Sequence, residues 1–76
     1  SGLIRYNAYS GLGGNLSFAL AILNYDNTGF VMNSVHAKEG SFLYIKEVME
    51  GSTSVELGAE EKLALEEALG YRRKKD

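Results

Sequence analysis

The chain has 76 residues, of which 45% are hydrophobic and 24% are charged, and its formal net charge is −2. This length predicts a single small domain, and no stretch approaches the roughly 18 consecutive apolar residues that a membrane-spanning helix needs. The sequence contains no cysteine, which excludes disulfides, zinc–thiolate sites and thiol catalysis. We expect one α+β domain over residues 1–70, followed by a basic C-terminal tail over residues 71–76.

Four to five short strands are predicted in an antiparallel meander. Gly29, Gly40 and Gly51 fall at equal steps, between segments rich in β-branched, aromatic and aliphatic residues. The predicted strands are Leu3–Tyr9, Asn15–Leu23, Phe30–Val35, Ser41–Val48 and a last short one around Ser54–Leu57. Between them, a hairpin loop is predicted at Asn24–Gly29 and turns at His36–Gly40 and Glu50–Ser52.

The second predicted strand alternates large apolar side chains with small ones, so it has one large face and one small face. Its large residues are Leu16, Phe18, Leu20 and Ile22. A C-terminal helix is predicted over Ala59–Leu69, with Gly58 as its N-cap and Gly70 at its end. We expect the apolar stripe of this helix to cover the large face. That stripe consists of Ala64, Leu65, Ala68 and Leu69.

The opposite face of the predicted sheet is the candidate interaction face, because it would carry small and hydrogen-bonding side chains. By strand alternation we place on it Arg5, Asn7, Ser17, Ala19, Ala21 and Asn33. Two interpretations stay open. The face either docks a partner, most simply a second copy of this chain, or it is the solvent-facing side that antiparallel sheets permit.

Neither catalytic, metal-binding nor cofactor-binding residues are assigned. His36 is the single histidine and fits a surface position beside a turn better than a metal site or a hydrolytic base. A different function class is a sensor of a small anionic ligand, in which Arg5, His36 and Lys38 surround the anion. The basic tail over 71–76 is interpreted as a solvated helix end, and no nucleic-acid partner is expected.

Several runs of the sequence resemble those of a bacterial family. They are Gly2–Tyr9, Gly13–Ala21, Asn27–Gly29, Ser34–Ser41, Tyr44 with Lys46, and Glu60–Lys62. On these runs the chain resembles the C-terminal soluble domain of the family called domain of unknown function 4446, from Gly2 to about Leu69. The resemblance implies no established activity. It implies a membrane-anchored protein of spore-forming Gram-positive bacteria, in which a transmembrane helix and a coiled coil precede this domain on the cytoplasmic side.

The chain departs from the family pattern at three positions. Members commonly have Arg where this chain has Lys38 and a basic residue where it has Phe42, so the resemblance carries no anion site over to these positions. Gly58 replaces the usual Ser or Thr cap. The leading prediction is a non-enzymatic protein-interaction or self-association domain, with a homo-oligomer or another protein as partner and membrane contact only through an upstream segment.

Overall fold

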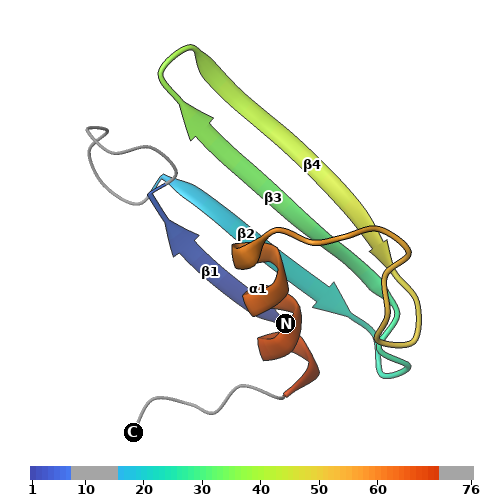
Figure 1. The fold of residues 1–76 in the computed structure, drawn as a ribbon. Helices are drawn as coiled ribbons and strands as arrows, with labels where there is room; N and C mark the ends of the chain where they lie inside the picture. The colour runs from blue at the N-terminus through green and yellow to red at the C-terminus, as the bar shows by residue number, and fades with distance from the viewer. Residues whose placement is uncertain (8–15, 71–76) are drawn as a thin grey trace, which may run out of the picture.

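The computed structural model describes residues 1–7 and 16–70, and these form a two-layer α+β unit (Figure 1). One antiparallel sheet has the strand order β1-β2-β3-β4, and a single helix lies on one of its faces. The elements are β1 (Gly2–Tyr6), β2 (Ser17–Leu23), β3 (Gly29–Ala37), β4 (Gly40–Val48) and α1 (Ala59–Leu69). The predicted α+β meander with a C-terminal helix is confirmed. The end of the first predicted strand, the start of the second and the predicted basic tail lie outside the described residues.

Two hairpin turns join β3 to its neighbours in the sheet, β2 and β4. In the first, the side-chain Oδ1 of Asn24 accepts hydrogen bonds from the backbone N–H groups of Asp26 and Thr28, at 2.8 and 3.1 Å. This side-chain turn confirms the predicted hairpin loop. The second turn is shorter than predicted, because β3 continues to Ala37, which pairs with Gly40 of β4. His36 therefore lies within a strand rather than in a turn.

The predicted fifth strand around Ser54–Leu57 is wrong. After β4, the chain reverses at Glu50 and Gly51, whose φ angles are 49° and 83°, and a single bridge joins Met49 to Ser52. Within the described residues, the segment beyond this turn joins no strand of the sheet. The Thr53 hydroxyl instead donates to the carbonyl of Val55 at 2.8 Å, a local bond that competes with strand pairing. The chain uses this segment to reach the opposite layer.

The helix α1 begins and ends where the sequence predicts. Gly58 is its N-cap, and the Gly58 N–H donates to Oε1 of Glu61 at 2.7 Å, which is the reciprocal half of a capping box. Gly70 adopts the left-handed conformation with φ 84°, and its N–H donates to the Glu67 carbonyl at 3.1 Å. Local cap chemistry was sufficient to set both ends.

The helix covers the small face of the sheet, so the prediction that it covers the large face is wrong. Ala19 and Ala21 of β2 are completely buried in the core beneath Ala64 and Leu65 of α1. In Figure 1 α1 lies across β1 and β2. Tyr44 of β4 pairs with Asn33, so it lies on the same side of the sheet as α1, and it is half exposed there. The helix stripe is as predicted, but it packs on the other side of the sheet.

Close backbone approach explains this choice of face. Gly2 of β1 lies against the backbone of α1 so closely that a Cβ on it would collide with the carbonyl oxygen of Ala64 and stand 2.9 Å from the backbone nitrogen of Ala68. A glycine in a strand permits such an approach, and small side chains on both layers let it continue along the contact. The large side chains of β2 would hold the helix away, so they lie on the opposite face.

Candidate functional site

An ion pair with a buried carboxylate and a partly exposed lysine joins the helix to the sheet. Glu61 of α1 is only 2% exposed, and its Oε1 lies 2.8 Å from Nζ of Lys46 on β4. The side chain of Asn33 on β3 also hydrogen-bonds to this carboxylate, while the Tyr6 hydroxyl of β1 donates to Oδ1 of Asn33 at 2.6 Å. The Glu61 carboxylate thus interacts with β4 through Lys46, with β3 through Asn33 and with the helix cap through the Gly58 N–H. The role of this cluster is structural, because the polar groups of Glu61, Lys46 and Asn33 interact with one another.

Opposing effects act on the pKa of Glu61. Burial raises it, because a charge is less well solvated beneath the helix. Hydrogen bonds from Lys46 and Gly58, the positive charge of Lys46 and the hydrogen bond with Asn33 lower it, and together they outweigh burial. The net result is a pKa below the usual value for a glutamate.

This lowered pKa predicts a loss of stability in acid. The ionised Glu61 contributes stability that is fully present above the unfolded-state pKa, about 4.5, and that contribution disappears as the pH falls through the lower folded-state pKa. We therefore expect the free energy of unfolding to decrease more between about pH 6 and about pH 3 in the wild type than in Glu61→Gln. Urea titration at the two pH values measures this decrease. Equal losses in the two proteins would show that Glu61 does not carry the pH dependence.

The sheet separates the residues that were predicted to share one face. Ser17 is 1% exposed on the helix-covered face, and its Oγ accepts a hydrogen bond from the backbone N–H of His36 at 2.9 Å. Asn33 lies on that face too, because it pairs with Ala19. Arg5 pairs with Phe18 and so lies on the opposite face. The predicted alternation within each strand is right, but the prediction that Arg5 shares a face with Ser17 and Asn33 is wrong.

The remaining predicted residues also do not converge. His36 is on the same side of the sheet as Arg5 but two strands away, and its Nδ1 lies 3.1 Å from the hydroxyl oxygen of Ser41. Asn7 is exposed just after β1, and Lys38 is exposed in the turn between β3 and β4. The geometry therefore brings together neither the predicted docking set nor the predicted anion-binding set.

The side of the sheet away from α1, called the open face below, is largely apolar. Register places Leu3, Leu20, Met32 and Ile45 next to one another in one row across all four strands. Adjacent rows add Phe18, Leu43, Ile22 and Phe30. The remaining open-face residues of the strands are Arg5, Ser34, His36, Ser41 and Glu47. This composition is that of a packed layer rather than of a solvated sheet side.

Many of these apolar side chains are in contact with solvent. Leu43 and Ile45 are 59% and 60% exposed, and Leu3 and Ile22 are 44% and 43% exposed. With Leu16, just before β2, and the half-buried residues between them, the face presents on the order of 600 Å² of surface, at the upper end of the patches that monomers expose. A contiguous apolar patch of this extent makes the open face the candidate interaction surface.

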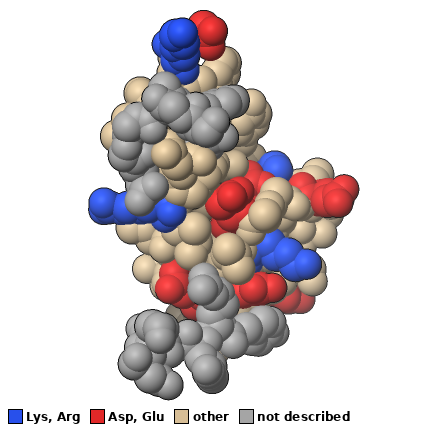
Figure 2. Space-filling model, turned by 60° about the vertical axis from the view of Figure 1, so that its left-hand side comes forward, with Lys and Arg blue, Asp and Glu red and all other residues tan. Residues whose placement is uncertain are grey.

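Charge is distributed differently on this face than elsewhere. On the side of the molecule drawn in Figure 2, acidic and basic side chains are interspersed with uncharged ones. Among the described strand residues of the open face, the Lys, Arg, Asp and Glu side chains are Arg5 and Glu47. They stand on the two edge strands, β1 and β4, at opposite corners of the apolar area.

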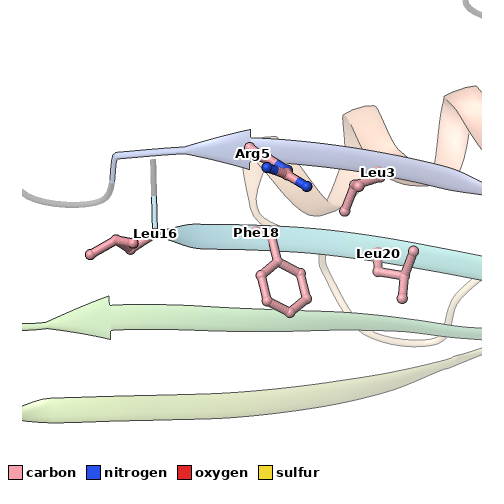
Figure 3. A pocket seen from close by; sticks show the side chains of 5 residues that line it. All are labelled: Leu3, Arg5, Leu16, Phe18 and Leu20. Carbon is pink, nitrogen blue, oxygen red and sulfur yellow. The ribbon is translucent and has the colours of Figure 1, made fainter. Parts of the chain in front are cut away.

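A shallow hollow lies next to Arg5 (Figure 3). It has a volume of about 420 Å³ and is lined by Leu3, Arg5, Leu16, Phe18 and Leu20. The side chains in Figure 3 come from β1, from β2 and from the residue before β2, and Arg5 stands among the four apolar ones. A hollow with apolar walls and one guanidinium is chemically suited to an apolar group that carries a carboxylate nearby.

Sequence reasoning missed Leu43, Ile45 and Glu47 as surface residues of interest. Their alternation along one strand was visible, since they occupy every second position of the fourth predicted strand. The missing information was which side of that strand the helix leaves uncovered.

Over the described part of the chain, fold and surface define a two-layer α+β domain in which one sheet face is apolar and has no layer over it. The chain belongs to the family described as protein of unknown function (DUF4446), whose family model matches residues 1–69. No curated protein and no solved structure matches it significantly. Over residues 1–7 and 16–70, no helix is long and apolar enough to cross a membrane. Nor do three metal-ligating side chains gather anywhere in those ranges.

Proposed function

We propose that this chain is a non-enzymatic self-association domain that pairs with a second copy of itself through the open face. The observation that carries the proposal is the position of α1, which buries the small face. Within residues 1–7 and 16–70, no layer covers the large apolar face. Removing that surface from water would release free energy in proportion to its area. A domain of this length has a thin core and gains much from such a second layer.

The extent and charge of the face favour a second copy as the occupant. Its area of on the order of 600 Å² approaches the ~800 Å² per partner of a standard interface. A two-fold dimer uses the same patch on both subunits, so the patch must complement itself. The open face meets this requirement because its apolar residues are central, while its positive Arg5 and negative Glu47 lie at opposite corners.

A charge placed in the apolar area should disrupt this association. We expect Leu43→Lys to raise the dissociation constant of the dimer at least tenfold, because the lysine would have to be desolvated in the interface. Sedimentation velocity over a concentration series measures this constant. Tyr44→Lys is the matched control, since Tyr44 is the next residue of β4, is 50% exposed against 59% for Leu43, and lies on the helix side.

Three outcomes would contradict the proposal. A wild-type chain that stays monomeric at all concentrations would remove it. Equal weakening by both lysine variants would indicate pairing through the β4 edge instead of the open face. A monomer that retains a small molecule in native mass spectrometry would support the alternative, a sensor for an anionic ligand at Arg5, because the hollow there has suitable walls.

A further inference from the structure

We infer that the hollow beside Arg5 receives Ile45 and Glu47 of a second copy, and that the second copy's hollow receives the same two residues of the first. This inference rests on the proposed self-association and specifies its geometry. Ile45 would fill the apolar part of the hollow, while the Glu47 carboxylate would meet the Arg5 guanidinium. A two-fold dimer would then contain two identical contacts of this kind.

The chemistry of the two partners matches. Ile45 is 60% exposed and Glu47 is exposed on the same side of β4, two residues further along. Such neighbours project about 7 Å apart in the same direction, as an apolar group next to a carboxylate. The hollow offers the complementary pair, with leucine and phenylalanine walls beside one guanidinium. Arginine binds a carboxylate through two parallel N–H donors, which gives the contact a direction.

The positions of the two charges define the two-fold axis. Arg5 on β1 and Leu43 on β4 lie in one row across the sheet, and three strand spacings of about 4.8 Å separate them. Glu47 lies four residues further along β4, about 13 Å from Leu43. The two separations are almost equal, so Arg5 and Glu47 mark the diagonal of a square. A two-fold axis along the other diagonal places Arg5 of each copy at the position of Glu47 of the other. The strands of the two copies then cross at nearly 90°, which is an established mode of sheet packing.

Packing with aligned strands fits the charges less well. A two-fold axis parallel to the strands would carry Arg5 onto the position of Leu43 in the second copy. Each guanidinium would then be buried against an apolar side chain, away from the carboxylate that can neutralise it. An unpaired buried charge is strongly unfavourable, whereas the diagonal axis pairs Arg5 with Glu47, the charged open-face residues of the described strands.

Charge reversal tests this pairing directly. Arg5→Glu alone would set the introduced carboxylate against that of Glu47 in both contacts, and Glu47→Arg alone would set two guanidinium groups together, so we expect each variant to dimerise at least tenfold more weakly. In a mixture of the two variants, each contact contains one arginine and one glutamate. The mixture should therefore form a one-to-one heterodimer with a dissociation constant within a few-fold of the wild-type value. Native mass spectrometry identifies this species because the two variants differ in mass.

Controls separate this inference from the proposed function. Lys62→Glu changes the net charge as Arg5→Glu does, but on the exposed side of α1, and should dimerise as the wild type does. Circular dichroism checks that all variants fold. If Leu43→Lys abolishes the dimer but the mixed variants stay monomeric, the Arg5–Glu47 pairing is wrong and the self-association through the open face stands. Charge-reversed variants that each dimerise normally would also overturn the pairing, and a monomeric wild type would remove both proposals.

Discussion

Replacing Glu61 by alanine is expected to lower the free energy of unfolding by about 2 kcal/mol or more, because its buried carboxylate accepts charge-assisted hydrogen bonds. The variant would leave the Lys46 ammonium without its carboxylate, and it would leave the Gly58 N–H without its acceptor at the helix cap. Urea titration followed by circular dichroism at neutral pH measures the change.

The neighbouring carboxylate provides the matched control. Glu60 lies in the same first turn of α1, where an acidic side chain interacts favourably with the helix dipole. Its removal in Glu60→Ala should therefore cost less than about 1 kcal/mol. If the two alanine variants lost similar amounts of stability, the ion pair under the helix would contribute no more than a surface charge does.

A second large loss of stability is expected from Gly2→Val. The new side chain would collide with the backbone of α1 at Ala64, and backbone atoms cannot move aside without shifting the helix. We expect a loss of about 3 kcal/mol, at the upper end for overpacked sites, and a melting temperature at least ~10 °C lower. Thermal unfolding followed by circular dichroism measures the shift.

The preceding residue serves as the comparison for this variant. Ser1→Val adds a side chain of the same kind at an exposed position just before β1, so the melting temperature should change little. In a domain of this size, 1 kcal/mol of stability corresponds to about 4–8 °C in melting temperature. A Gly2→Val protein that melts within a few degrees of the wild type would therefore show that the helix can move away from β1 at small cost. The close approach would then not be what selects the small face of the sheet.

Together, these two contacts account for the uncovered apolar surface. The contact at Gly2 lets α1 pack closely on β1, and the Glu61–Lys46 pair joins the start of the helix to β4. With the helix committed to the small face, the large residues of β2 and the exposed Leu43 and Ile45 of β4 have no layer of their own chain over them within the described residues. Stability and the proposed self-association thus depend on the same choice of face.

Local sequence signals determined the elements of the fold. Gly58 and Gly70 bound the helix, because cap positions are set by the few residues around each end. Asn24 marks the first hairpin, since its side chain makes the turn's own hydrogen bonds. Alternation along each strand was also readable, because it follows from backbone geometry. These features depend on residues within a few positions of one another.

Tertiary structure alone decided which face is covered and which residues meet. Alternation separates two faces of β2 but does not say which one the helix takes, and both are apolar when alanine is counted. The choice follows from how closely two backbones can approach at Gly2, a contact between residues far apart in the sequence. The register between β1 and β2 likewise depends on packing across the sheet, and it places Arg5 opposite Phe18 on the open face and buries Ser17 under the helix.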